Sequence, residues 1–239
     1  MKTIGILGGM SWKSTLEYYR LINEEIKSRL GGFHSAKILL YSFDFSEIEH
    51  LQHQGSWQKL GEILKDKAQK LEQAGADFLL IATNTMHKVA PMIEKTISIP
   101  LLHIADATAD AIKKQGHQRV GLLGTEFTME EDFYCGRLKK KHQIDVLIPP
   151  KEKRRLIHKI IFHELIGGNI NEESRQKFIE IIEDLKANGA QGIILGCTEI
   201  PLLIKPEHSP LPVYDTTAIH ARSAVDMALA QTSGVTKWN

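Results

Sequence analysis

The stretch Gly189-Ala190-Gln191-Gly192-Ile193-Ile194-Leu195-Gly196-Cys197-Thr198-Glu199 decides how this chain is expected to fold. An apolar run that ends in a thiol and two polar residues is typical of a buried strand with a cysteine at its tip. A near copy, Gly75-Ala76-Asp77-Phe78-Leu79-Leu80-Ile81-Ala82-Thr83-Asn84-Thr85, lies upstream. When the two Gly-Ala pairs are aligned, Cys197 falls opposite Thr83, and we expect these two strand tips to act together.

Two further pairs of segments repeat in the same order and at a nearly constant offset. Residues 120–125 resemble residues 4–9, and residues 211–215 resemble residues 99–103. Three ordered matches indicate an internal duplication. The sequence therefore predicts an α/β fold with two similar lobes of parallel sheet flanked by helices and related by pseudo-twofold symmetry. Ligands of such sheets bind beyond the carboxyl ends of the strands, so the active site is expected in the cleft between the lobes.

The lobe boundaries follow from the repeats. The first lobe is expected to comprise residues 1–103 plus 214–239, and the second residues 104–213.

Strand and helix patterns alternate along the whole chain, as in a parallel sheet covered by helices. Residues 14–17 (Ser-Thr-Leu-Glu) match a capping box and predict the start of the first helix. Its apolar face is expected to contain Tyr19, Ile22, Ile26 and Leu30. Residues 57–74 predict a second amphipathic helix, and residues 231–239 have no pattern and are expected to be a frayed end.

Composition excludes several classes of protein. The 239 residues include 30 Lys plus Arg and 29 Asp plus Glu, so no basic field favours nucleic acid. Two cysteines do not make a disulfide framework, and the N-terminus lacks a signal sequence, so the expected location is the reducing cytoplasm. No segment has the length and apolar character of a membrane span.

Other ligand classes lack their motifs. The glycines after the first strand, Gly8 and Gly9, match neither the dinucleotide fingerprint nor the P-loop, and are expected to form a tight turn that could offer N–H groups to a carboxylate. The histidines and cysteines show no metal-ligand spacing, so no metal is expected. Asp215, His220 and Cys197 could form a hydrolytic triad, but the G-x-S-x-G context of such enzymes is absent.

Cys197 is the candidate for chemistry among the two cysteines. A free thiol has a pKa of about 8.5, and backbone N–H groups at a helix N-terminus lower it. The position of Cys197 at a strand tip favours this effect. Cys135 lies in a predicted helix without a counterpart in the other repeat, and is expected to be structural.

Three motifs together resemble the aspartate/glutamate racemase family. They are Gly8-Gly9-Met10-Ser11-Trp12, Thr83-Asn84-Thr85-Met86-His87 and Gly196-Cys197-Thr198-Glu199-Ile200, and the resemblance extends from about Thr3 to Val225. It implies a cofactor-independent amino-acid racemase in which each lobe contributes one cysteine. One thiolate removes the substrate's α-proton, and the other thiol delivers a proton from the opposite face.

This chain departs from the family pattern at the first catalytic position, where Thr83 replaces cysteine. Because a hydroxyl is a much weaker acid than a thiol, Thr83 can relay a proton but needs help to act as a base. The resemblance implies that Cys197 is the base towards the L-enantiomer, with Thr83 on the opposite face. We therefore expect a racemase that acts on L-aspartate, L-glutamate or both.

The remaining site residues are carried over from the resemblance. Those expected to contact the substrate are Met10, Ser11, Gln52, Asn84, Thr85, Thr125, Thr198 and Glu199. Glu164 stands where a lysine would help to hold a distal carboxylate, so the choice between aspartate and glutamate stays open. The expected partner is a small amino acid, without nucleic acid or membrane, and a homodimer stays open.

Two alternatives remain at this stage. The first is a binding or regulatory protein that kept the site and lost turnover with the first cysteine. The second is a related isomerase or decarboxylase of small carboxylates, because one fold can host several chemistries.

Overall fold

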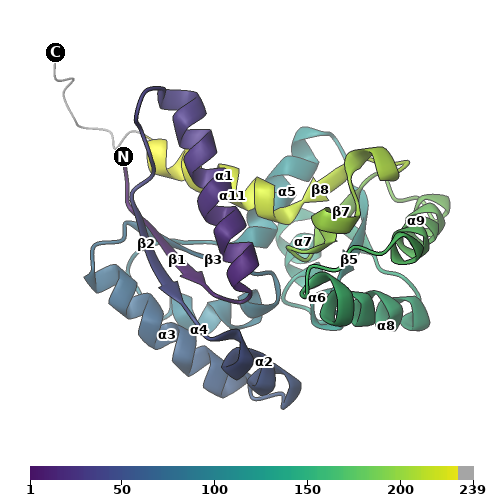
Figure 1. Cartoon of the computed structure of the whole chain (residues 1–239), viewed down its shortest axis with the longest axis horizontal. Coiled ribbons are helices and arrows are strands. Elements are labelled where there is room, and N and C mark those ends of the chain that lie inside the picture. Colours follow the sequence, from purple (N-terminus) through teal and green to yellow (C-terminus); the bar gives the residue numbers. More distant parts are fainter. Residues whose placement is uncertain (231–239) are drawn as a thin grey trace. The chain divides into compact units, whose positions relative to one another are not determined.

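A computed structural model describes residues 1–230, and the chain forms two compact units (Figure 1). The first unit contains residues 1–82, 89–102 and 220–230, and the second contains residues 83–88 and 103–219. The segment 231–239, for which we predicted a frayed end, lies outside the described residues.

The first unit contains a four-stranded parallel sheet. Its strands are β1 (Ile4–Gly8), β2 (Ile38–Ser42), β3 (Phe78–Ile81) and β4 (Leu101–Leu102), in the order β2-β1-β3-β4. Its helices are α1 (Trp12–Leu30), α2 (Phe45–His53), α3 (Trp57–Gln73) and α4 (Ala90–Glu94). Every residue of β1 and β3 is buried, as expected of central strands covered on both faces.

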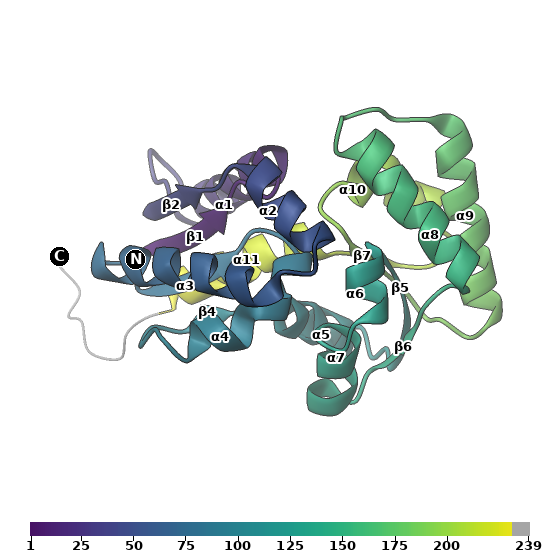
Figure 2. The same cartoon turned by 90° about the horizontal axis from the view of Figure 1, so that it is seen from below.

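Helices cover both faces of this sheet (Figure 2). Helices α1 and α11 (Thr216–Leu229) pack on one face, where they share an apolar cluster with β1 and β3. Helices α3 and α4 pack against each other on the other face. The predicted amphipathic helix at residues 57–74 is confirmed as α3, which buries Leu60, Leu64, Ala68 and Leu71.

The predicted start of the first helix is wrong. Helix α1 begins at Trp12, and its N-cap is Ser11, whose hydroxyl accepts a hydrogen bond from the Ser14 N–H at 3.4 Å. Thr15 is occupied elsewhere, because its hydroxyl accepts from the Gly9 N–H at 2.7 Å and donates to the Ser11 carbonyl at 3.0 Å. The capping-box residues therefore lie inside the helix and tie its first turn to the β1–α1 turn.

The buried face of α1 matches the predicted one at Ile22 and Ile26 and differs at its two other positions. Tyr18, Ile22 and Ile26 are buried, whereas Tyr19 and Leu30, which we expected in the core, are exposed. The tight turn after β1 is confirmed: Gly9 has φ +85°, and a Cβ there would lie 2.3 Å from the Phe43 carbonyl oxygen.

The second unit repeats the strand order of the first. Its strands are β5 (Arg119–Gly124), β6 (Asp145–Leu147), β7 (Ile193–Gly196) and β8 (Val213–Asp215), all parallel, in the order β6-β5-β7-β8. Its helices are α5 (Ile104–Lys114), α6 (Glu126–Glu130), α7 (Cys135–His142), α8 (Lys151–Ile160), α9 (Glu172–Ala187) and α10 (Ile200–Leu203). Helices α5 and α7 lie on one face and α8 and α9 on the other (Figure 2). The prediction of two parallel α/β sheets flanked by helices is confirmed.

The units divide the chain at other residues than the expected lobe boundaries. The expected return to the first lobe at residue 214 lies within β8, which hydrogen-bonds to β7. The second unit therefore extends to Ile219 and includes the first turn of α11. It also takes up the short segment 83–88, which follows β3 of the first sheet.

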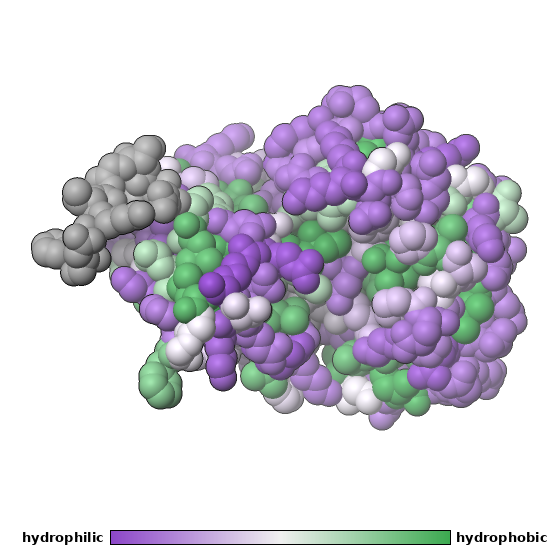
Figure 3. Space-filling view, turned by 90° about the horizontal axis from the view of Figure 1, so that it is seen from above, coloured by the Kyte–Doolittle hydropathy of each residue, from purple (hydrophilic) through white to green (hydrophobic). Residues whose placement is uncertain are grey.

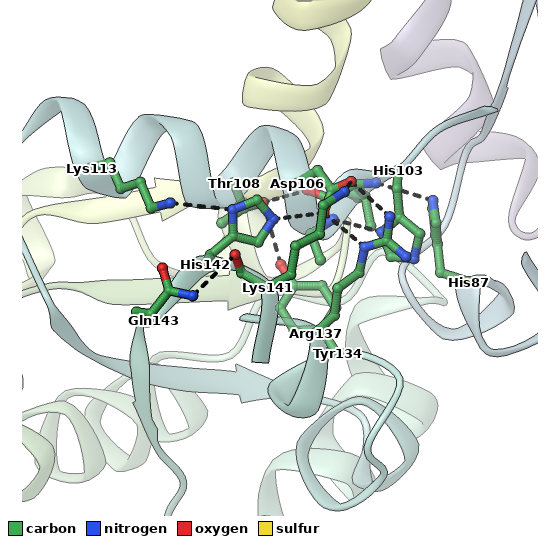
Figure 4. Close-up of polar contacts among 12 residues, drawn as sticks. His87, His103, Asp106, Thr108, Lys113, Tyr134, Arg137, Lys141, His142 and Gln143 are labelled. Atoms are coloured by element: carbon green, nitrogen blue, oxygen red, sulfur yellow. Dashed lines mark hydrogen bonds and ion pairs between the residues drawn. The ribbon is translucent and has the colours of Figure 1, made fainter. Parts of the chain in front are cut away.

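A single carboxylate connects α7 to α5 in the second unit (Figure 4). Asp106 accepts hydrogen bonds at 2.7 Å from two guanidinium nitrogens of Arg137, from the Lys141 ammonium and from the His142 ring. Burial works to raise the pKa of Asp106, but these donors outweigh burial and hold the pKa well below its usual value. The Asp106 carboxylate therefore stays ionised throughout the neutral range and holds α7 on α5.

The face of the molecule drawn in Figure 3 is mostly hydrophilic, with apolar residues in small, separate patches. Among residues 1–230, no helix combines the length and the apolar character needed to cross a membrane.

A buried histidine joins three elements of the first unit. The His220 ring on α11 accepts from the Tyr18 hydroxyl at Nδ1 (2.8 Å) and donates from Nε2 to the Leu102 carbonyl (2.9 Å). The neutral His220 ring therefore makes a hydrogen bond at each of its nitrogens, accepting at Nδ1 and donating at Nε2. Burial lowers the pKa of His220 from its ordinary 6.5 to about 4, although the bond to Leu102 works in the opposite direction.

This shift predicts a pH-dependent stability. Between pH 6.5 and 4 the unfolded chain protonates His220 and the folded chain does not, so the free energy of unfolding falls as the pH falls through that window. The slope from this one group approaches about 1.4 kcal/mol per pH unit. Urea unfolding at several pH values would measure it. The variant His220→Gln should be less stable at pH 7 and lose this part of the slope, whereas equal slopes in both proteins would contradict the assignment.

Candidate active site

Two glycines bring the tips of β5 and β7 together. Gly124 and Gly196 are register partners at the carboxyl ends of these strands. A Cβ on Gly124 would lie 3.0 Å from the Gly196 carbonyl oxygen, and one on Gly196 would lie 2.7 Å from a Leu122 methyl group. Only glycine allows this approach without movement of its neighbours. The next residues along the two strands are Thr125 and Cys197.

The Cys197 thiol is bonded to a neighbouring carboxylate. Its Sγ donates to Oε2 of Glu199 at 3.0 Å, and the Thr198 hydroxyl donates to the same oxygen at 2.6 Å. Cys197 is only 9% exposed, and Glu199 is also buried. Two donors on a carboxylate oxygen, one of them a thiol, fix the direction of the S–H bond.

The pKa of Cys197 contradicts our expectation of an acidic thiol. Burial raises it well above the usual value, and the negative charge of Glu199 raises it further. The N–H groups of Glu199 and Ile200 work in the opposite direction, as expected at a strand-to-helix turn, but they do not outweigh burial. Cys197 therefore rests as a thiol, and its proton lies on the path to Glu199.

The segment that follows β3 contributes the next group of site residues. The 3₁₀ helix η1 (Thr85–Val89) begins there, and Thr83 before it is half-buried. The Thr85 hydroxyl lies 3.2 Å from the Thr125 hydroxyl, and both side chains are buried. The segment after β3 thus lies beside the tip of β5 within the second unit.

Asn84 reaches the second sheet through a residue that the sequence analysis missed. Its Nδ2 donates to the Thr216 hydroxyl at 3.0 Å, and that hydroxyl donates to the Leu195 carbonyl, two residues before Cys197, at 2.9 Å. Thr216 starts α11 directly after β8. Its position in the sequence could have marked Thr216 as a site residue. Asp215-Thr216-Thr217 lies at the end of the fourth strand of its sheet, as the predicted site residues lie at the ends of other strands.

Two buried polar atoms in this region have no hydrogen-bond partner within the described chain. They are Oδ1 of Asn84 and the hydroxyl oxygen of Thr217. Both side chains are almost fully buried. An unpaired buried acceptor costs about 1–3 kcal/mol, so each of these oxygens is open to a further hydrogen-bond donor.

The other predicted contact residues lie in the first unit. Met10, Ser11 and Gln52 are all buried, and the Ser11 hydroxyl serves as the N-cap of α1.

Glu164 lies in a π-helical turn after α8, where its carboxylate accepts from the Ser174 hydroxyl at 2.7 Å.

The structure does not form the hydrolytic triad. Both ring nitrogens of His220 are engaged by Tyr18 and Leu102, so this ring is not available as a base for Cys197. The Asp215 carboxylate caps α11 by accepting from two backbone N–H groups. Within residues 1–230, no group of three or more histidine, cysteine, aspartate or glutamate side chains is arranged to hold a metal ion.

Cys135 has a structural position on α7. Its Sγ donates to the Met129 carbonyl at 3.5 Å, and burial raises its pKa to about 11.

The chain has two α/β sheets with the same strand order, and a buried thiol and threonines lie at the strand tips. The same features are expected of the amino-acid racemases that the sequence motifs resemble. The chain matches the Asp/Glu/Hydantoin racemase family over residues 7–224 and belongs to that family. Its class is that of the amino-acid racemases, which are isomerases.

Individual relatives are similar to this chain over nearly its whole length. The broad specificity amino-acid racemase RacX of Bacillus subtilis is 26% identical over 235 residues, which cover 96% of this chain and 100% of RacX. The crystal structure of a "putative Asp/Glu Racemase" from Yersinia pestis is 54% identical with a TM-score of 0.91, and covers 96% of this chain and 100% of that one. An aspartate racemase homologue from Pyrococcus horikoshii is 36% identical with a TM-score of 0.82, with coverages of 95% and 99%.

The charge of Glu199 predicts how the Cys197 thiol titrates. In a Cys135→Ser background, which leaves one thiol, the rate of alkylation by iodoacetamide should rise with pH to a midpoint above the usual range. The substitution Glu199→Gln removes the like charge and should lower that midpoint. A midpoint that stays the same or rises in the variant would show that Glu199 does not face the thiol as an anion.

Proposed function

We propose that this protein is a cofactor-independent racemase that acts on L-aspartate, L-glutamate or both by two-base exchange of the α-proton. The observation that supports it most is the hydrogen bond from Cys197 to Glu199 at the end of β7. A thiol that must become a thiolate here has a proton acceptor already in contact. In this proposal, Glu199 is therefore an acid–base partner of Cys197, in addition to the substrate contact that the sequence suggested.

The first step removes the α-proton from the L-enantiomer. The thiol proton passes to the Glu199 carboxylate, and Sγ takes the proton from the α-carbon. The electron pair of the broken C–H bond stays on the substrate as a carbanion conjugated with its carboxylate. Because the thiol is raised above its usual pKa by burial and by Glu199, the thiolate is a strong base when it forms.

The second step delivers a proton to the opposite face. The Thr83 hydroxyl donates to the carbanion, which gives the D-enantiomer. Solvent then returns a proton to the Thr83 oxygen and takes the proton from Glu199, so both groups regain their starting state. Because a hydroxyl is a weak acid, this step is expected to limit turnover. The two enantiomers have equal free energies in water, so kcat/KM is the same in both directions, and any preference appears in kcat and KM separately.

The two buried oxygens without a hydrogen-bond partner, Oδ1 of Asn84 and Oγ1 of Thr217, suit an amino-acid substrate. An α-ammonium group carries three N–H donors and no acceptor. The unpaired oxygens of Asn84 and Thr217 offer it two acceptors at buried positions. The hydroxyls of Thr85 and Thr125 can donate to a carboxylate of the same substrate. These contacts select an amino acid and leave its side-chain length open.

One observation favours a second candidate, a homologue that binds amino acids without turnover. Thr83 stands where the resemblance implies a thiol, and the pKa of Cys197 is raised, which favours the protonated form. Such a protein would keep the acceptors of Asn84 and Thr217 and lose the proton transfer.

Product analysis separates these candidates. Purified protein incubated with L-aspartate or L-glutamate should yield the D-enantiomer, measured by chiral chromatography, without added cofactor. Loss of the Cys197 thiol in Cys197→Ala should lower the rate by roughly 10²–10⁴-fold, because a general base is removed. The matched control Cys135→Ser should keep the wild-type rate. Formation of a decarboxylated product, or binding without any D-enantiomer, would refute the proposal.

A further inference from the structure

His87 is a buried histidine whose two ring nitrogens are both engaged beside Thr83. Its side chain is 1% exposed. Nδ1 lies 2.8 Å from the Thr83 carbonyl oxygen, and Nε2 lies 3.2 Å from the backbone nitrogen of Ile104. A carbonyl only accepts and a backbone N–H only donates, so Nδ1 carries the proton and Nε2 is the acceptor. The contacts fit one neutral tautomer of the ring.

Backbone geometry explains why a side chain is needed at this place. In an α-helix, the N–H of residue 87 would serve the carbonyl of residue 83. Here the chain turns as the 3₁₀ helix η1, and the His87 N–H donates to the Asn84 carbonyl at 3.1 Å instead. The His87 ring replaces the missing donor. One residue therefore holds the carbonyls of both Thr83 and Asn84.

The other side of the ring is fixed by α5. The Ile104 N–H is the first of this helix and has no partner within it. The neighbouring ring of His103, 4.5 Å away between centroids, accepts from the Ala105 N–H at 3.2 Å. Two histidines thus satisfy consecutive N–H groups at the start of α5 (Figure 4). The segment around Thr83 is thereby attached to a helix of the second unit.

We propose that His87 is a positioning residue for Thr83: it holds the Thr83 backbone so that the hydroxyl can deliver its proton to the substrate. The inference rests on the proposed function and adds to it a residue that touches no reacting atom. A displacement of about 1 Å at a catalytic group can lower a rate roughly a hundredfold. Loss of the hydrogen bond to the Thr83 carbonyl is therefore expected to lower the turnover rate.

Two substitutions separate the two bonds of the ring. In His87→Asn, the side-chain amide can take the place of Nδ1 and keep the bond to Thr83. In His87→Gln, the longer side chain can place its oxygen near the position of Nε2, which keeps the acceptor for Ile104 and loses the donor to Thr83. The matched control His103→Asn keeps an acceptor for the Ala105 N–H.

The experiment incubates L-aspartate and L-glutamate with the enzyme in D₂O. It measures two rates: α-deuterium incorporation into the L-enantiomer (retention) and formation of the D-enantiomer (inversion). Retention requires only the Cys197 face, whereas inversion also requires Thr83. We expect His87→Gln to lower inversion roughly tenfold or more relative to retention. His87→Asn and His103→Asn should keep a ratio close to that of the wild type. A purely structural role would lower both rates together, so an unchanged ratio in His87→Gln would overturn the proposal.

Ring NMR of the wild-type protein tests the contact without any turnover. A nitrogen–proton correlation spectrum should show the His87 ring protonated at Nδ1 and bare at Nε2. A ring protonated at Nε2 would overturn the proposal even if the variants failed to fold. If the wild-type protein neither exchanged nor inverted either amino acid, the proposed function would fail and the catalytic role of His87 with it, while the tautomer would still report the contact.

Discussion

The hydrogen bond between the Cys197 thiol and the Glu199 carboxylate is the interaction on which the account of this site depends. It places a proton donor and a proton acceptor side by side in a buried environment, where neither gains much from water. Burial and the negative charge raise the thiol pKa, so the site stores a proton rather than a thiolate. In the proposed mechanism, Cys197 becomes a base only when its proton moves, and Glu199 is the carboxylate in contact that takes it.

The fold supplies this pair through the carboxyl ends of parallel strands. Gly196 allows β7 to lie close to β5, and the chain then turns at Cys197 so that Glu199 follows within one turn. Thr216, at the tip of β8, connects the Leu195 carbonyl to Asn84. The segment after β3 is held in turn by His87, whose ring replaces a helical hydrogen bond. Each site residue of the second unit thus follows a strand end or is bonded to a residue that does.

Much of this arrangement was predictable from the sequence, because the repeats marked the strands and polar residues marked their tips. Details that depend on packing were not. The start of α1 was misplaced because Ser11, three residues before the expected cap Ser14, caps the helix and accepts from the Ser14 N–H. The thiol was expected to be acidic because sequence shows the nearby N–H groups but not the burial that outweighs them. His87 and Thr217 were missed as site residues because their roles depend on which atoms have partners in three dimensions.

In the proposed mechanism, Cys197 and Thr83 serve opposite faces of one substrate. The most direct test is Thr83→Ala incubated with L-aspartate and L-glutamate in D₂O, with configuration and α-deuterium content measured together. We expect the variant to incorporate α-deuterium into at least one of the L-enantiomers and to lose formation of the D-enantiomer. Undiminished formation of the D-enantiomer, or loss of exchange into both L-enantiomers in a folded variant, would contradict it.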